Sequence, residues 1–198
     1  MNDIDDAMLE LIRVHNKYSL PGSFRRRSQV DARWPSNLNR SVQLDYFFNN
    51  YEPVDVKLES GFTPIKFVNL DSLEKAQIGY KWTNIDTNTK LNEGGDHASV
   101  VVLDDSGGGK PLVAKTNIEN TPVFASYGVV APFRISDSLA DFLNALAKLI
   151  EIVYGEFNIF DVSDDDGLSS LFVARVEADI SPLLGNKNFR GFFDYFYG

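Results

Sequence analysis

The clearest pattern of apolar and polar positions lies between residues 132 and 155. Within it, apolar residues recur at steps of three and four: Leu139, Phe142, Leu143, Leu146, Leu149, Ile150 and Val153. This spacing places one continuous apolar stripe on one face of a helix. Ser138, with Asp141 three residues later, is typical of a capped helix start, and Gly155 suits the left-handed position just past a helix end. The pattern therefore predicts a helix of about four to five turns that packs its stripe on a sheet.

Further helices are predicted nearer the two ends of the chain. Residues 4–17 have apolar side chains at helical spacing, and the Pro-Gly pair at 21–22 ends that pattern. A short helix is predicted after Pro35, and another over 168–180. The run Arg25–Arg27 is predicted to lie in an exposed loop, because three basic residues are too few for a nucleic-acid-binding arm.

Between these helices the chain reads mostly as short strands. They are predicted at 54–58, 61–70, 78–85, 97–105, 110–116 and 121–130, with one capped turn of helix at 71–77. The later strands are separated by Gly-rich or Asn-rich turns, which is the signal of an antiparallel meander. We therefore expect an α+β fold, with a mainly antiparallel (mixed) sheet of about five to six strands and helices packed on it. No internal repeat or linker interrupts the pattern, so residues 1–198 are expected to form one domain.

The end of the chain, residues 156–198, combines an acidic segment with an aromatic-rich extension. Six aromatic residues fall within the last ten: Phe189, Phe192, Phe193, Tyr195, Phe196 and Tyr197. They either dock on the body of the domain and complete its core, or they form an exposed interface. Docking is the favoured prediction, because a free tail this apolar would promote aggregation.

Composition and charge narrow the classes of function. Formal net charge is −9, and residues 1–50 contribute +1 of it, with seven Lys and Arg against six Asp and Glu. The remaining residues are strongly acidic, which argues against nucleic acid as the partner and favours a basic protein. Cysteine is absent, no apolar run reaches the length of a membrane span, and the acidic start does not resemble a secretory signal. We expect a cytoplasmic protein that does not bind a membrane.

Motifs that carry chemistry are weak in this sequence. The segment "DDSGGGKP" has Asp104 and Pro111 at positions where a phosphate-binding loop needs Gly and Ser or Thr, so a hairpin turn is predicted instead. The segment "DVSDDDG" lacks the Gly and Glu of a calcium-binding loop. His15 and His97 are the two histidines, and neither stands in a metal-ligand spacing. We predict no catalytic residue, no cofactor and no metal site.

Four segments taken together resemble the SUKH superfamily, the Smi/Knr-type domain. They are "WPSNLNRSVQLDYFFNNY" at 34–51, "PIKFVNLDSLEKA" at 64–76, "GGDHASVVVLDDSGGGKPLVA" at 94–114, and "PVFASYG" followed by "SDSLADFLNAL" up to residue 146. The resemblance covers about residues 34–150. The chain departs from the family pattern at Asn49-Asn50-Tyr51, where Asn-Gly is usual, at Pro35, and at Leu139, where Phe is usual.

The resemblance implies an α+β fold that acts through protein contacts. Bacterial members of the superfamily are largely immunity proteins that bind and neutralise a cognate toxin domain, such as a nuclease, and fungal relatives regulate cell-wall synthesis. The sequence therefore predicts a non-enzymatic protein-binding module, with a regulatory scaffold or a small hydrolase that uses His97 as alternatives. From charge clustering, the candidate contact residues are Asp104, Asp105, Asp161, Asp164, Asp165 and Asp166.

Overall fold

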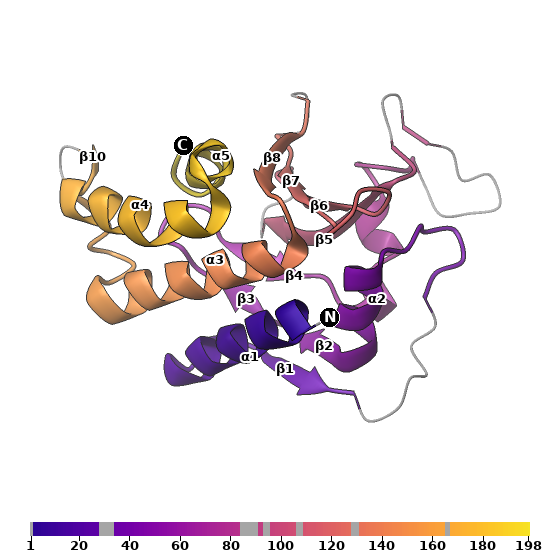
Figure 1. Cartoon of the computed structure of the whole chain (residues 1–198), viewed down its shortest axis with the longest axis horizontal. Coiled ribbons are helices and arrows are strands. Elements are labelled where there is room, and N and C mark those ends of the chain that lie inside the picture. The colour runs from indigo at the N-terminus through magenta and orange to yellow at the C-terminus, as the bar shows by residue number, and fades with distance from the viewer. Residues whose placement is uncertain are drawn as a thin grey trace.

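The computed structural model describes residues 2–27, 34–83, 91–92, 96–105, 109–127, 131–164 and 167–198 (Figure 1). In this part of the chain it contains five α-helices, one six-stranded antiparallel sheet and two two-stranded sheets. The six-stranded sheet has the order β3-β4-β5-β6-β7-β8, in which every neighbouring pair is antiparallel. The predicted α+β class with an antiparallel meander is thus confirmed.

The strands are short and the helices long. The large sheet comprises β3 (Lys57–Leu58), β4 (Ile65–Phe67), β5 (Ser99–Asp105), β6 (Leu112–Lys115), β7 (Val123–Ala125) and β8 (Phe133–Ser136). The small sheets pair β1 (Ser23–Arg26) with β2 (Tyr51–Val54), and β9 (Ser163–Asp164) with β10 (Gly167–Leu168). The helices are α1 (Asn2–Lys17), α2 (Val42–Asn50), α3 (Leu139–Glu151), α4 (Ser170–Leu184) and α5 (Asn186–Tyr197).

Helix α3 is the centre of the helical layer. It lies between α1 and α4, and its apolar stripe is buried in the core (Figure 1). Ser138 caps it as predicted, since its hydroxyl accepts a hydrogen bond from the Asp141 N–H at 2.9 Å. Its end differs from the prediction, because the chain continues into a π-helical turn, Ile152–Glu156, that contains Gly155. Gly155 lies close to Tyr18, because a Cβ at this position would collide with the Tyr18 hydroxyl and require that side chain to move.

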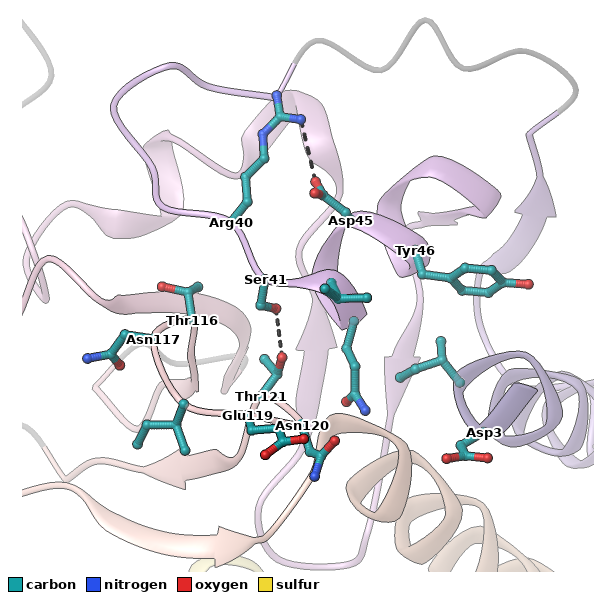
Figure 2. Close-up of a pocket in the computed structure, with 14 residues that line it drawn as sticks. Asp3, Arg40, Ser41, Asp45, Tyr46, Thr116, Asn117, Glu119, Asn120 and Thr121 are labelled. Carbon is teal, nitrogen blue, oxygen red and sulfur yellow. Dashed lines mark hydrogen bonds and ion pairs between the residues drawn. The ribbon is translucent and has the colours of Figure 1, made fainter. Parts of the chain in front are cut away.

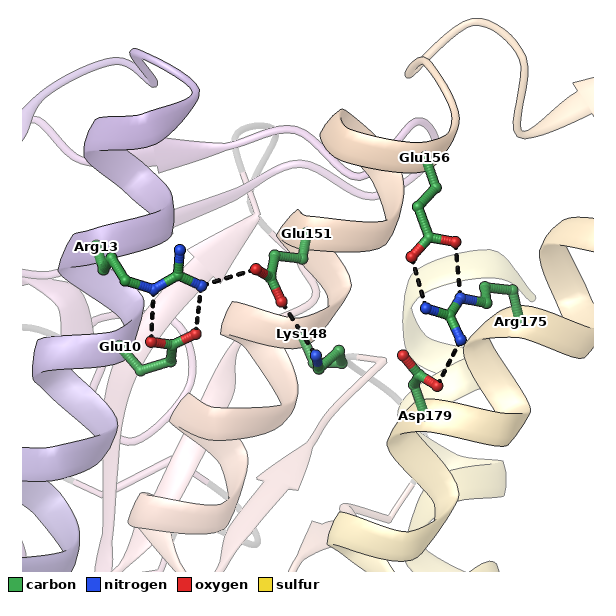
Figure 3. Close-up of polar contacts among 7 residues, drawn as sticks. All are labelled: Glu10, Arg13, Lys148, Glu151, Glu156, Arg175 and Asp179. Atoms are coloured by element: carbon green, nitrogen blue, oxygen red, sulfur yellow. Dashed lines mark hydrogen bonds and ion pairs between the residues drawn. The ribbon is translucent and has the colours of Figure 1, made fainter.

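Arginine side chains form ion pairs at the solvent-facing edges of the helices (Figure 3). Arg13 of α1 contacts Glu10 at 2.6 Å and reaches across to Glu151 of α3 at 2.7 Å. Arg175 of α4 contacts Glu156 at 2.6 Å, in the π-helical turn that follows α3. Exposed pairs of this kind contribute little to stability, so the apolar core, and not the ion pairs, holds α1, α3 and α4 together.

The strand predicted at 78–85 is wrong over residues 78–83, while 84 and 85 lie outside the described residues. Here the chain forms turns with isolated bridges at Ile78 and Trp82. Beside β5, the buried side chains of Gln77 and Lys81 form hydrogen bonds with backbone groups that a neighbouring strand would otherwise pair. Gln77 donates to the Val101 carbonyl at 3.1 Å and accepts from the Val101 N–H at 2.9 Å. Lys81 donates to the carbonyls of His97 at 2.8 Å and of Ser99 at 3.0 Å.

The loop predicted at Arg25–Arg27 is also wrong, because β1 includes Arg25 and Arg26 and pairs with β2. Phe24 anchors this strand: its ring meets His15 at 5.4 Å and Phe67 at 5.1 Å, both edge to face. The basic side chains stay at the surface. Arg26 pairs with Asp5 at 2.9 Å, and Arg25 is exposed.

Helix α2 and the first 3-10 turn start at other residues than the sequence predicts. Helix α2 begins at Val42, well after Pro35, with Ser41 as its cap, and Val42 itself is 72% exposed. At 70–72 the cap is Asn69, whose side chain accepts from the Ser72 N–H at 2.9 Å, in place of Asp71 or Ser72. These shifts move element boundaries and leave the order of elements unchanged.

The aromatic tail is docked, as predicted. It forms α5, in which five of the six aromatic side chains are buried: Phe189, Phe192, Tyr195, Phe196 and Tyr197. Tyr195 donates to the Lys110 carbonyl at 2.7 Å, and Tyr197 to the Ser60 carbonyl at 2.9 Å. Helix α5 also lies against β8, the last strand of the sheet. The tail therefore fills the core and covers a sheet edge that would otherwise be free to pair.

Candidate protein-binding groove

A cavity of about 640 Å³ opens where α2 begins (Figure 2). Its walls come from the first residues of α1, from residues 40–46 and from the turn between β6 and β7 at 116–121. A second hollow of about 410 Å³ shares Asp3, Gln43 and Asn120 with it and extends to the start of α3. We call the two together the acidic groove.

Hydrogen bonds fix the walls of the groove relative to one another. The Ser41 hydroxyl caps α2 by accepting from the Leu44 N–H at 3.2 Å, and it also accepts from the Thr121 hydroxyl at 2.7 Å (Figure 2). The Leu139 N–H at the start of α3 donates to the Gln43 side chain at 3.0 Å and to the Asn120 carbonyl at 3.1 Å. Because these bonds join α2, α3 and the β6–β7 turn, the groove is preformed.

The β6–β7 turn, which forms one wall of the groove, has an unusual backbone. Asn120 and Thr121 both adopt positive φ angles, 61° and 54°. A β-branched residue such as Thr121 is strained in this conformation. Its hydroxyl bond to Ser41 and its burial, at 1% exposure, hold it there.

The groove is strongly acidic. Among the described residues that line it, the carboxylates are Asp3, Asp6, Asp45, Glu119 and Asp141, and the single cation is Arg40. Part of this charge has a local structural reason, because α1, α2 and α3 all begin here and carboxylates stabilise the N-terminal ends of helices. Glu119 stands on a turn and has no such reason. The net negative charge suits a cationic ligand.

Two aliphatic side chains add apolar surface to the groove. Val42 is 72% exposed and Ile118 is 43% exposed, although both are large hydrophobic residues, and both line the cavity. An exposed valine at the first position of a helix contributes nothing to the core. The arrangement of aliphatic surface beside carboxylates matches a partner side chain with an apolar stem and a cationic end.

Tyr46, Tyr51, Asp5 and Arg26 form a polar cluster, of which Tyr46 alone lines the cavity. A hydrogen bond from the Tyr51 hydroxyl lowers the pKa of the Asp5 carboxyl, assisted by the charge of Arg26. Burial raises the pKa of Tyr46, which lines the cavity, and that of Tyr51. Asp5 is thus held ionised and both phenols neutral at neutral pH.

The predicted contact residues lie elsewhere. Asp104 and Asp105 lie on β5, opposite Lys66 and Ile65 of β4. Strand β5 is an inner strand of the sheet, between β4 and β6. Asp161 is exposed and comes after the C-terminal end of α3, whereas the groove is at the N-terminal end of α3. Its neighbour Phe160 is 80% exposed.

The remaining predicted contact residues, Asp164, Asp165 and Asp166, follow Asp161 in the same acidic segment. Asp164 is paired through its backbone with Gly167 in the β9–β10 hairpin, and its side chain lies outside the description. Asp165 and Asp166 lie outside the described residues. Among the described residues, none of the aspartates predicted as contact residues lines the groove, where the local sequence signals are the cap at Ser41 and the acidic first turns of three helices.

Neither histidine lies at the groove. His15 is 2% exposed, and its Nε2 lies 3.1 Å from the Pro21 carbonyl, which is a structural role. His97 is exposed on the turn before β5, and its carbonyl accepts from Lys81. Among the residues that the structure describes, no group of three or more His, Cys, Asp or Glu side chains is placed to hold a metal ion.

Comparison with protein-family models, with curated proteins and with solved structures finds no match to this chain. The resemblance to the SUKH superfamily therefore stays a prediction from the residues quoted above. Within the described ranges, no helix is both long enough and apolar enough to cross a membrane.

Proposed function

We propose that this chain is a non-enzymatic protein-binding module that acts as an immunity protein, binding a cognate toxin domain and neutralising it. The observation that supports this proposal most is the acidic groove, a preformed cavity with five carboxylates against one arginine among its described lining residues. A nuclease domain is a fitting partner, because it needs a basic cleft for its own substrate and an acidic protein can block that cleft.

The resemblance of four sequence segments to the SUKH superfamily is a second support for the proposal. Along residues 34–150 the order is α2, β2, β3, β4, two short 3-10 turns, β5 to β8 and α3. The four segments that carry the resemblance fall on α2 and β2, on β4 with the 3-10 turns, on β5 and β6, and on β7 with α3. A likeness of fold cannot fix a function by itself, so the proposal depends on the groove.

Co-expression with the toxin domain encoded by the neighbouring reading frame tests the proposal. We expect protection of the host cells and a one-to-one complex that survives purification. The double variant Asp45→Asn, Glu119→Gln should weaken the complex about tenfold or more, since it removes two charges from the groove.

A matched control removes two charges elsewhere. The variant Asp161→Asn, Glu177→Gln changes the net charge equally at exposed positions outside the groove. It should bind as the unmodified protein does. Absence of any complex would reject the immunity function, and a larger loss in the control than in the groove variant would move the contact to the acidic segment around Asp161.

A further inference from the structure

Arg40 has a special position in the acidic groove. It is the one cation among the described lining residues, and it stands directly before the cap of α2. Its Nη1 lies 3.5 Å from the Asp45 carboxylate, and the two side chains are 53% and 37% exposed (Figure 2). A pair this long and this exposed is weak, so the guanidinium can leave Asp45 at little cost.

Arg40 also has a second contact that does not depend on Asp45. Its Cζ lies 5.5 Å from the centre of the Trp34 ring, a cation–π distance. Trp34 is itself fixed, because its indole N–H donates to the Leu38 carbonyl at 2.8 Å. If another cation takes Asp45, Arg40 therefore keeps a favourable position against Trp34.

We propose that Arg40 occupies the place of an arginine from the partner protein, which displaces it from Asp45 on binding. This inference rests on the proposed function and adds the chemistry of the contact. The incoming guanidinium meets Asp45, and its aliphatic stem lies along the exposed Val42 and Ile118 side chains. Arginine fits better than lysine, because its planar fork can bond a carboxylate through two N–H groups at once.

Arg40 then competes with the ligand for the same carboxylate. A protein whose binding-competent state is only partly populated shows a reduced apparent affinity, and removal of the competitor restores it. Arg40→Ala should therefore bind arginine more tightly, by up to about fivefold, which is the upper end of the effect expected for loss of an exposed ion pair.

The experiment follows backbone amide signals of the ¹⁵N-labelled full chain while N-acetyl-arginine amide is added. N-acetyl-lysine amide and N-acetyl-citrulline amide, the neutral analogue of arginine, serve as comparison probes. We expect arginine to shift the amides of residues 40–46 and 116–121 most, lysine to bind more weakly and citrulline to cause no saturable shift.

Arg25→Ala is the matched control for Arg40→Ala, because it removes the same charge from an exposed position on β1 outside the groove. The gain in affinity should be found in Arg40→Ala and not in Arg25→Ala, and Asp45→Asn should lose binding. Arg40→Gln is the second variant if Arg40→Ala does not fold, as judged by the dispersion of its amide signals.

The inference is overturned if both arginine variants bind the probe equally, if citrulline binds as well as arginine, or if the shifts fall outside the groove. Its failure is distinguishable from failure of the proposed function. A toxin complex that is sensitive to Asp45→Asn, Glu119→Gln but shows no arginine preference would remove the Arg40 mechanism alone.

Discussion

At the scale of single residues, Gln77 shows how one side chain can replace a strand. Its amide pairs with both backbone groups of Val101, at 3.1 and 2.9 Å, and it is fully buried. The registered pairing of β4 with β5 runs from Ile65 to Phe67 opposite Asp105 to Leu103, so Gln77 continues the pairing beyond the end of β4. An unpaired buried N–H or carbonyl costs about 1–3 kcal/mol, which makes this one amide important for stability.

Replacing Gln77 by Leu should lower the free energy of unfolding by about 3 kcal/mol, because Val101 would lose both partners while the buried volume stays similar. Urea denaturation measures this change. Asn16→Leu, at an exposed amide of α1, is the control and should change stability by less than about 0.5 kcal/mol. Equal effects of the two variants would show that the Gln77 pairing is dispensable.

Asp96 sets a dependence of stability on pH. Burial opposes its ionisation, but hydrogen bonds from the Lys115 ammonium, the Ala98 N–H and the Ser99 hydroxyl outweigh burial and lower the pKa of its carboxyl to about 2. Since an unfolded Asp titrates near about 3.9, this stabilisation is complete above that pH and is lost as the pH falls toward about 2.

Between pH 4.5 and pH 2.5 the protein should therefore lose on the order of 1 kcal/mol through Asp96, a value reduced for a side chain that is 42% exposed. Asp96→Asn should lack this part of the acid sensitivity, while Asp161→Asn should keep it. Urea denaturation at the two pH values gives the comparison. An unchanged acid dependence in Asp96→Asn would contradict the assignment.

At the scale of elements, the docking of α5 on β8 depends on the small residue Gly191. A Cβ at this position would lie 3.0 Å from the Arg134 carbonyl oxygen and 3.1 Å from the Phe133 ring. Helix and strand are thus packed so closely that any larger side chain would force the neighbouring atoms to shift. The close approach seats the aromatic side chains of α5 in the core and closes the edge of the sheet.

Gly191→Leu should separate α5 from β8 and destabilise the fold by about 1–3 kcal/mol, the usual cost of overpacking. Ala178→Leu places the same leucine side chain at an exposed position of α4 and should be nearly neutral. Comparison of the free energies of unfolding of the two variants tests whether the close packing of α5 on β8 stabilises the fold. A stable Gly191→Leu protein would mean that α5 is loosely attached.

The sequence predicts elements well where one periodic stripe faces one surface, as in α3. It fails where side chains replace backbone partners, since the pattern at 78–83 looks like a strand although Gln77 and Lys81 do the pairing. It also fails at β1, where a charged run follows Phe24, the partly buried ring that packs on the core. The groove escapes it because Ser41 and Thr121, which meet there, are 80 residues apart.

At the scale of the whole molecule, the two acidic regions are separated by the length of α3. The groove lies where α3 begins, and the exposed Asp161 follows the π-helical turn at its end. Clustering of aspartates in the sequence pointed to the second region, whereas cavity shape, exposed aliphatic surface and convergent carboxylates all favour the first. We therefore propose that the partner binds at the groove.

Hydrogen exchange of the complex with the toxin domain tests this assignment most directly. Backbone amides buried by a partner exchange more slowly, so the footprint identifies the contact surface without any substitution. We predict slower exchange at residues 40–46 and 116–121 on complex formation, with residues 157–162 unchanged. Slower exchange at 157–162 with an unchanged groove would contradict the account.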